Sequence, residues 1–373
     1  MDFSFLTVGK IIFGPGRIRE IGAEAESLGS RVLLVAGRGF LRGTGRLAEI
    51  ESLLRDGSLD VAVFDAVPPE PSLEDVQSGI EVLRARKCDL VVAVGGGSAL
   101  DVGKVIAGLA HAPAPVSEYF KGRDVEKKGL PFIAAATTAG SGAEVTPNAV
   151  LVDRKAGVKA SIRSPHLLAD VAIVDPELTL TIPPNVTADS GMDALCQAVE
   201  AFVSRGANPL TDALALDASV RLLRHLPEAY AHGDNLSLRT EVALGSLMGG
   251  MAFSNARLGL AHGMAHPLGI ATGLPHGLIC GLLLPPVMRF NMPVSEAKYS
   301  RLARDAGLGG ADELISEIER MNAEMRLSAR LLELRVGREK WPAIVSQSVN
   351  TGSTKSNPQS VSEGDISRIL GEL

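Results

Sequence analysis

Residues 89–98 read Asp-Leu-Val-Val-Ala-Val-Gly-Gly-Gly-Ser, an apolar run that ends in three glycines and a serine. The run Asp89–Val94 is short, apolar and rich in valine, which is typical of a strand buried in a parallel sheet. A helical stretch with Asp101 and Lys104 follows. Glycine lets the backbone approach an anion closely, and free N–H groups at a helix start bind phosphate. Gly95–Ser98 therefore predicts a phosphate-binding loop, with a simple tight turn as the alternative.

The pattern on either side of this loop predicts two domains. Further short apolar runs in the first half predict strands at Arg31–Val35, Val61–Phe64 and Phe132–Ala136, and Ser72 begins a predicted helix that ends at Arg86. Strands that alternate with helices predict a parallel sheet covered on both faces. Later apolar residues recur at helical spacing in Asn185–Ser204, Leu210–His225, Ser237–Leu258, Ala297–Ala306 and Ala311–Met321. Pro183-Pro184 is the predicted boundary between an α/β domain (1–183) and a helical domain (184–373), and 346–362 is expected to be a polar loop.

Composition narrows the class of protein. The 373 residues are 46% hydrophobic with a net charge of −6, which disfavours nucleic acid as a partner. Cys88, Cys196 and Cys280 fit no disulfide framework, so we expect a reducing, cytoplasmic location without a signal peptide. The apolar stretch Gly277–Met288 is broken by glycine and proline and is too short to span a bilayer.

Two further loops contain small residues. Thr137–Glu144 follows the predicted strand Phe132–Ala136 and offers hydroxyl and amide groups at the same sheet edge as Gly95–Ser98, which suggests two walls of one cleft. Gly43–Ala48 matches the spacing of a dinucleotide fingerprint, but it does not directly follow a strand. We interpret this second stretch as a loop and helix cap.

Three of the seven histidines lie close together in the sequence. His262 and His266 are four residues apart and share one helix face, and His276 follows a glycine-rich turn. Histidine is the commonest metal ligand, although core histidines satisfied by hydrogen bonds are the alternative. Asp193 lies in a mostly apolar helical segment, where an unpaired carboxylate is costly to bury. A metal ion or a buried hydrogen-bond network would account for it.

Taken in order, these motifs resemble the iron-containing (group III) alcohol dehydrogenase family along nearly the whole chain. The resemblance is carried by Gly95–Ser98 with Asp101 and Lys104, Thr137–Glu144, Asp175–Leu178, Gly191–Leu195, the three histidines, and Asn357-Pro358 before the final helix. It implies a Rossmann-like α/β domain followed by an all-α domain, the dehydroquinate synthase-like fold, with a cofactor cleft between them. It also implies a homodimer or higher homo-oligomer.

The resemblance further implies roles for single residues. One divalent metal, iron(II) or zinc, would be held by Asp193, His262 and His276, with His266 lining the active site as the catalytic residue. The predicted cofactor-binding residues are Gly95, Gly96, Gly97, Ser98 and Asp101 at the pyrophosphate loop, Thr137, Thr138 and Ser141 on the nicotinamide side, and Gly37, Arg38, Lys159, Leu178 and His276.

Two positions depart from the family pattern. The remaining metal ligand should be a histidine four residues after Asp193, but that residue is Gln197, whose neutral amide is a poorer ligand. Gln197 could coordinate weakly or leave the place to water, Cys196 could bind as a thiolate, or the site could be metal-free. After the strand Arg31–Val35 the family commonly has an aspartate that rejects a 2′-phosphate. Gly37 stands there, followed by Arg38, which favours NADP over NAD.

The predicted reaction is hydride transfer between NAD(P)H and a small aldehyde, ketone or alcohol, assisted by a metal. His266 would relay the proton. The alternatives are a metal-independent reductase of the maleylacetate reductase type, a dehydroquinate-synthase-like lyase, and a non-catalytic cofactor-binding protein. Aromatic residues are only 4% of the chain, and no aromatic substrate box is evident.

Overall fold

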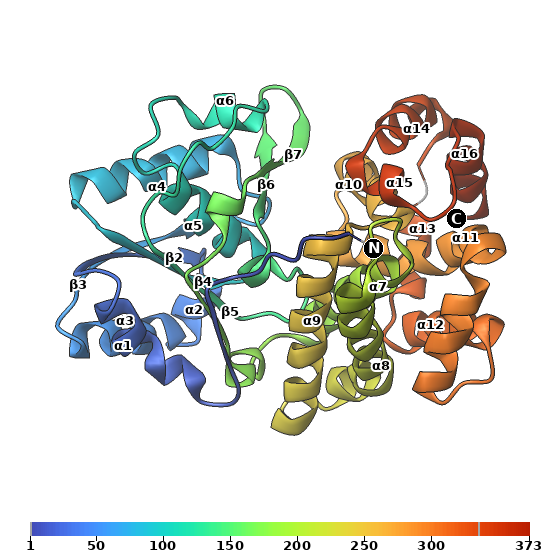
Figure 1. Ribbon diagram of the computed structural model, residues 1–373, viewed down its shortest axis with the longest axis horizontal. Helices are drawn as coiled ribbons and strands as arrows, with labels where there is room; N and C mark the ends of the chain where they lie inside the picture. Colours follow the sequence, from blue (N-terminus) through green and yellow to red (C-terminus); the bar gives the residue numbers. More distant parts are fainter. Residues whose placement is uncertain (1, 335) are drawn as a thin grey trace. The chain divides into compact units, whose positions relative to one another are not determined.

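The computed structural model describes residues 2–334 and 336–373 and divides into two compact units (Figure 1). The α/β unit comprises Leu6–Thr138 and Gly142–Thr181. The helical unit comprises Ile182–Leu373, together with Ala139–Ser141 and the N-terminal residues as far as Phe5. A parallel sheet in the first unit and helices in the second confirm the predicted fold class.

The α/β unit is built on a six-stranded parallel sheet with the order β1-β8-β5-β4-β2-β3. Its strands are β1 (Lys10–Phe13), β2 (Arg31–Gly37), β3 (Asp60–Val67), β4 (Leu90–Gly95), β5 (Phe132–Ala136) and β8 (Val171–Val174). β3 lies on one side of β2 and β4 on the other, so the direction of strand order reverses beside β2. Open α/β sheets bind ligands outside the carboxyl ends of the strands at such a point.

Helices cover both faces of this sheet (Figure 1). Side chains of α1 (Ile21–Glu26) and α3 (Arg46–Asp56) pack against alternate residues of the central strands, such as Val92 and Val94. α4 (Leu73–Ala85) and α5 (Gly97–Gly108) lie against the other face. A Cβ atom at Gly103 would be 2.5 Å from the Cβ of Ala93, so glycine lets α5 approach β4 closely.

Smaller elements complete the α/β unit. The Ser72 hydroxyl accepts a hydrogen bond from the Asp75 amide and caps α4, as predicted. The short helices α2 (Phe40–Gly43) and α6 (Val116–Phe120) connect larger elements. β6 (Asn148–Asp153) and β7 (Val158–Arg163) form an antiparallel hairpin.

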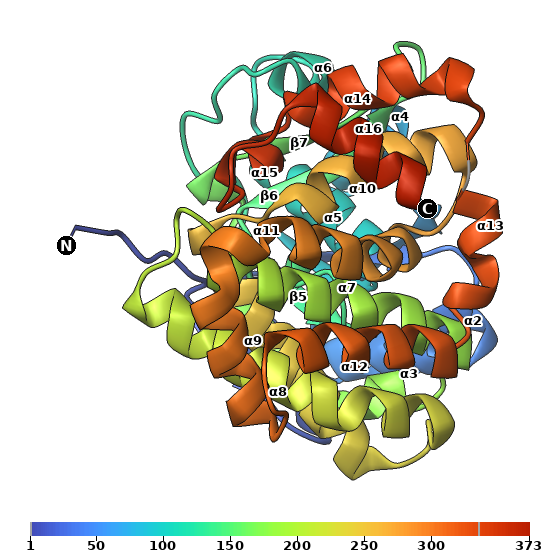
Figure 2. The same ribbon diagram turned by 90° about the vertical axis from the view of Figure 1, so that its right-hand side faces the viewer.

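The helical unit contains ten α-helices in the described part of the chain (Figure 2). They are α7 (Pro184–Val203), α8 (Pro209–Ala231), α9 (Leu236–Ala256), α10 (Leu260–Thr272), α11 (His276–Ala306), α12 (Ala311–Glu324), α13 (Leu331–Leu334), α14 (Trp341–Val349), α15 (Gly352–Ser356) and α16 (Glu363–Glu372). α11 packs against both α7 and α12, and its first turns lie in the core of this unit.

Several elements differ from the sequence-based prediction. β1, β8 and the β6–β7 hairpin lie outside the predicted strands. β1 and β8 have only four residues each, whereas β7 alternates apolar and polar residues along its six positions and was a usable signal. α11 runs for 31 residues through Pro285, Pro286 and Pro293, which suggested breaks. It is long and apolar enough to cross a membrane, but 72% of its most apolar window is buried, as in a core helix. The predicted polar loop at 346–362 contains the end of α14 and all of α15.

Candidate functional site

Three helices of the helical unit bring Asp193, His262 and His276 together. Asp193 comes from α7, His262 from the first turn of α10, and His276 is the first residue of α11. The Asp193 Oδ1 atom lies 3.3 Å from Nε2 of His262 and 3.7 Å from Nε2 of His276. These ligand atoms and the sulfur of Cys280 all lie within 4.8 Å of one another. The resulting cluster of one carboxylate, two imidazoles and one thiol is referred to below as the α7–α10–α11 centre.

A glycine sets the close approach of α11 to α7. A Cβ atom at Gly277 would lie 1.9 Å from the Asp189 carbonyl oxygen and 3.2 Å from the Asp193 Cβ. Only a residue without a side chain fits there. The first turn of α11 therefore rests directly on the backbone of α7, which brings His276 next to Asp193.

The centre combines a buried part with a more accessible part. The His262 side chain is 3% exposed and that of Asp193 is 10% exposed, whereas His276 is 26% exposed. Burial alone would raise the pKa of Asp193, but His276 and His262 hold that pKa below its usual value. Burial alone would lower the pKa of His262, but Cys280, Asp193 and Glu200 raise it well above its usual value. The surroundings thus favour an ionised Asp193 carboxylate beside a positive charge, which a protonated imidazole or a bound cation can supply.

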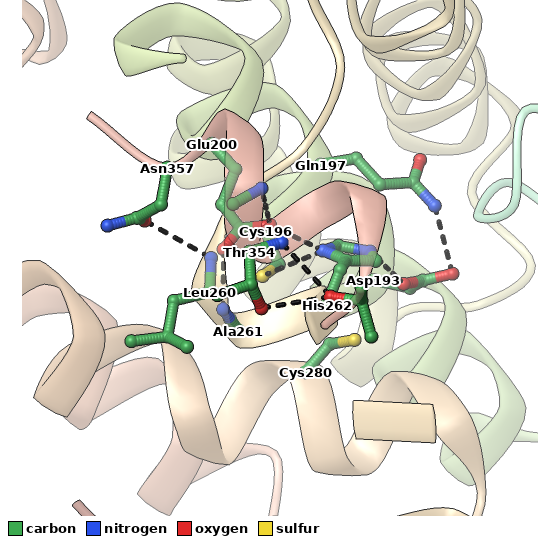
Figure 3. A network of polar contacts seen from close by, with 12 residues as sticks. Asp193, Cys196, Gln197, Glu200, Leu260, Ala261, His262, Cys280, Thr354 and Asn357 are labelled. Atoms are coloured by element: carbon green, nitrogen blue, oxygen red, sulfur yellow. Dashed lines mark hydrogen bonds and ion pairs between the residues drawn. The ribbon is translucent and has the colours of Figure 1, made fainter. Parts of the chain in front are cut away.

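Glu200 anchors His262 from the side opposite Asp193 (Figure 3). Its carboxylate accepts a hydrogen bond from His262 Nδ1 at 2.7 Å, and from the backbone amides of Gly259 at 2.9 Å and Ala261 at 2.7 Å. One buried carboxylate on α7 therefore caps the start of α10 and orients the imidazole. With Nδ1 donating to Glu200, Nε2 is directed toward Asp193, as in carboxylate–histidine–metal arrangements.

Gln197 lies one turn after Asp193 and contacts it through the amide nitrogen. Its Nε2 atom donates to Asp193 Oδ2 at 3.1 Å. Its Oε1 atom is buried and finds no hydrogen-bond partner among the described residues. In this arrangement the amide supports the carboxylate, and its oxygen, the only atom of the group that could bind a metal, does not face Asp193.

Two buried cysteines lie near His262, and their side chains contact each other. The Cys196 sulfur lies 3.7 Å from Nδ1, on the side of Glu200. Cys280 lies one turn after His276 on α11, with its sulfur 3.5 Å from Nε2 of His276. The predicted stand-in ligand, Cys196, therefore approaches the ring nitrogen that Glu200 already occupies. Cys280 was not predicted, although its spacing of four residues from His276 within an apolar helix was a usable signal.

His266 lies beside the centre. It follows His262 by one turn of α10, and its ring stacks on His276 with a centroid separation of 4.8 Å and an interplanar angle of 22°. The structure thus brings the fourth predicted residue into contact with the more accessible imidazole of the centre.

In the α/β unit, the predicted phosphate loop lies at the carboxyl edge of the sheet. Gly95 ends β4 with φ of 157°, and a Cβ atom there would clash with Ala99 at 2.6 Å and lie 3.7 Å from the amide nitrogen of Gly37. Gly97 and Ser98 form the first turn of α5, whose start no side chain caps within the described residues. An uncapped helix start of this kind offers free N–H groups to an anion.

The threonines of the second loop meet this edge. The Thr137 amide donates to the Gly95 carbonyl at 3.0 Å, and a Cβ atom at Gly96 would lie 3.4 Å from the Thr138 hydroxyl. Ser141, by contrast, clusters with the helical unit. Arg38 is exposed after the end of β2, and its Nη2 atom donates to the Ala66 carbonyl at 3.2 Å.

Asp101 and Lys104 are engaged in bracing the hairpin. The Lys104 ammonium is buried and donates to the Asn148 carbonyl at 2.7 Å and the Thr146 hydroxyl at 3.1 Å. Asp101 accepts from the Val150 amide at 2.8 Å and lies 3.4 Å from the Lys104 ammonium. These bonds tie α5 to β6, so the contacts of both side chains are structural ones.

The last two predicted cofactor residues have partners within the α/β unit. Lys159 forms an ion pair with Glu70 at 2.5 Å. Leu178 is buried in the core beneath the sheet. The carboxylate of Asp175 in the same motif accepts hydrogen bonds from the amides of Gly16 and Ile18 at 3.1 and 2.8 Å. This motif therefore anchors the N-terminal segment to the sheet.

Comparison with known proteins gives consistent matches over the whole chain. The model "Iron-containing alcohol dehydrogenase" matches residues 9–176, and "Fe-containing alcohol dehydrogenase family, C-terminal" matches residues 187–373. The chain is 33% identical to an NAD-dependent methanol dehydrogenase from Bacillus methanolicus over 96% of each protein. It is 31% identical to an NADPH-dependent butanol dehydrogenase from Clostridium saccharobutylicum, over 96% of this chain and 95% of the relative. A crystal structure of 1,3-propanediol oxidoreductase is similar with a TM-score of 0.95, 36% identity and full coverage of both chains.

Proposed function

This chain belongs to the iron-containing alcohol dehydrogenase family, and from this premise we propose that it transfers a hydride between NADPH and a small aliphatic aldehyde or the corresponding alcohol. Its relatives are NAD- or NADPH-dependent dehydrogenases of small alcohols. The chain is thus an NAD(P)-dependent oxidoreductase, and the sequence resemblance is confirmed. The choice of NADPH, the substrate and the roles of single residues are our proposal.

One observation carries the proposal, namely the convergence of Asp193, His262 and His276 from three helices. Carboxylate oxygen and imidazole nitrogen are suitable ligands for iron(II) and zinc, and both Nε2 atoms lie within 4 Å of the same Asp193 oxygen. The donor set therefore fits one divalent metal. When bound, a metal would supply a Lewis acid for the substrate oxygen, and the nicotinamide would supply or accept the hydride.

The chain's own residues would position and protonate the reactants. Asp193, His262 and His276 would hold the metal, and Glu200 would fix the orientation of His262. His266, stacked on His276, would exchange the alcohol proton with solvent as a general acid and base. The free amides at the start of α5 would bind the pyrophosphate of the cofactor.

Turnover with a metal tests this proposal directly. The purified protein is loaded with iron(II) or zinc, and NADPH oxidation is followed with a panel of short-chain aldehydes. We expect Asp193→Asn to lower kcat/KM by at least about a hundredfold, because a metal ligand and a buried charge are lost together. The absence of turnover with every aldehyde and both metals would refute the proposed reaction.

The preference for NADPH rests on Gly37 and Arg38. Gly37 brings no carboxylate to the end of β2, and Arg38 is an exposed cation beside it. A Cβ atom at Gly37 would meet only the Val67 carbonyl, at 4.0 Å, so aspartate can be introduced there without a clash. We expect Gly37→Asp to shift the ratio of kcat/KM for NADPH over NADH toward NADH by about tenfold or more. An unchanged ratio would contradict the proposed role of this position.

A metal-independent reductase is a second candidate, which the contact of Gln197 with Asp193 favours. The amide stabilises the carboxylate with a hydrogen bond of 3.1 Å, a role that a metal would otherwise fill. Metal analysis of the purified protein and of Gln197→His separates the two candidates. A metal-free, active wild type whose variant gains neither metal nor rate would support the metal-independent reaction.

The remaining expectations also belong to this proposal. The domain boundary at Pro183-Pro184 is supported by the start of α7 at Pro184 and by the division of the compact units after Thr181. A cytoplasmic location is supported by three free cysteines, all buried. A homodimer or higher homo-oligomer is the assembly that the family membership favours.

A further inference from the structure

The sulfur of Cys280 faces the same point as the three expected metal ligands. It lies 3.5 Å from Nε2 of His276, and within 4.8 Å of the ligand atoms of Asp193 and His262. The side chain is fully buried and rises from α11 below His262 (Figure 3). Four donors from three helices thus surround one position. Zinc takes four ligands in most protein sites and can expand to five when a substrate oxygen binds.

Position 197 does not provide the missing donor. The amide of Gln197 is turned so that its nitrogen donates to Asp193, and its oxygen is buried without a partner among the described residues. Without Cys280, a cation at the centre would find one carboxylate and two imidazoles as direct donors, because the carboxylate of Glu200 lies behind His262, bonded to its Nδ1 atom. A thiolate at Cys280 would add a fourth direct donor.

From these contacts we infer that Cys280 is a metal ligand, which gives the centre one oxygen, two nitrogen and one sulfur donor and selects zinc over iron(II). Binding forms a metal–sulfur bond and releases the thiol proton to solvent, without any change of oxidation state. Thiolate is a softer ligand than a carboxylate, and it favours zinc and cobalt(II) over metals that prefer oxygen ligands. The inference rests on the metal centre of the proposed function and deepens it.

Cobalt(II) provides a readout that is independent of turnover. Bound to a thiolate, it shows a sulfur-to-cobalt charge-transfer absorption in the near ultraviolet. The full chain is freed of metal, titrated with Co²⁺, and its absorption and bound metal are measured for the wild type, Cys280→Ser and Cys196→Ser. Cys196 is the matched control, because it is equally buried and contacts the same imidazole, but at Nδ1, 3.7 Å away on the side of Glu200.

We expect the wild type and Cys196→Ser to bind one Co²⁺ with the charge-transfer band. Cys280→Ser should keep bound Co²⁺ but lose the band, and its zinc affinity should fall by a factor on the order of ten to a hundred. A one-to-one wild-type complex without the band, or a band lost in Cys196→Ser and kept in Cys280→Ser, would overturn the assignment of Cys280 alone. A wild type that binds no Co²⁺, zinc or iron would overturn the metal centre itself.

A second variant keeps the test decisive if Cys280→Ser folds poorly. Gln197→His restores an imidazole on α7 and leaves Cys280 in place. We expect this variant to raise the ratio of bound iron(II) to bound zinc when both metals are offered, because a nitrogen donor then competes with sulfur. An unchanged ratio, with the charge-transfer band absent in the wild type, would overturn the inference.

Discussion

Replacing Glu200 by glutamine tests whether one buried carboxylate organises both a helix start and a metal ligand. In the wild type, Oε2 accepts from the Gly259 amide and from His262 Nδ1, and Oε1 accepts from the Ala261 amide. Glutamine has nearly the same shape but carries one oxygen and one NH₂ group. If its oxygen takes the place of Oε2, the NH₂ group faces the N–H of Ala261, and two donors meet without an acceptor.

The size of the effect follows from these three bonds. Hydrogen bonds to a charged group contribute about 1.5–3 kcal/mol each, and a buried donor without a partner costs about 1–3 kcal/mol. One such bond is lost and two lose their charge, so we expect a free energy of unfolding lower by about 2–4 kcal/mol. For a unit of this size each kcal/mol corresponds to roughly 2–4 °C in Tm. Loss of the partner that orients His262 should also weaken metal binding by about ten- to a hundredfold.

The assay is thermal denaturation of the metal-free protein together with metal titration of the same preparation. Asn357→Ala is the control, because the Asn357 Oδ1 atom accepts from the neighbouring Leu260 amide at 3.1 Å. That variant should lose stability but keep its metal affinity. Equal losses of metal affinity in both variants, or a Glu200→Gln protein with unchanged affinity, would refute the role assigned to Glu200.

Three further predictions concern the supports of the site. Gly277→Ala places a Cβ atom 1.9 Å from the Asp189 carbonyl oxygen, so we expect the free energy of unfolding to fall by about 1–3 kcal/mol and the variant to bind less metal. Gly352→Ala is the control, because there is open space around Gly352, and its stability should not change in the same denaturation assay. Burial raises the pKa of Asp189 to about 6, so this carboxyl favours the folded state below its unfolded pKa near 4, and that contribution is lost as the pH rises through about 6. Asp189→Asn should therefore be more stable than the wild type at pH 7 by about 1–2 kcal/mol in urea denaturation. Its free energy of unfolding should also vary less between pH 4 and 6. A pH dependence equal to that of the wild type would contradict this. Asp101→Asn should cost about 3–5 kcal/mol in the same assay, because the buried Lys104 ammonium loses its charged partner, and a loss below 1 kcal/mol would show that the pair does not brace the hairpin.

The sequence predicts the α/β half best where strand and loop occur together. The run Asp89–Ser98 contains a strand, a glycine loop and a helix start in direct succession, and the structure has β4, Gly96 as the N-cap, and α5 in that order. The edge strand β1 and its neighbour β8 have only four residues each, and their pairing joins segments about 160 residues apart. Local patterns contain no information on such a long-range contact, so these strands could not be predicted.

In the helical half, tertiary packing overrides local signals. Three prolines inside α11 suggested that the helix breaks, yet its first half is buried on several sides against α7 and α12, and this packing maintains the helix.

Asp101 and Cys280 illustrate the same limit of local patterns at single residues. For Asp101, the motif resemblance suggested a cofactor contact, and no local pattern indicated the hydrogen bond that its carboxylate accepts from Val150 in the β6–β7 hairpin. Cys280 has the four-residue spacing from His276 that a shared helix face requires, but a cysteine within an apolar helix is more often a core residue.

The position of Asn357 has a consequence for the order in which the protein assembles during synthesis. Its side chain accepts from the Leu260 amide at the start of α10 and exchanges hydrogen bonds with Asn291 on α11, at 3.0 and 2.7 Å. Residue 357 is made 97 residues after residue 260, so the ribosome releases α10 and most of α11 before this fastening exists. The first turn of α10 therefore gains this bond only after residue 357 has been translated, whereas Glu200 on α7, which is made before α10, can hold His262 earlier.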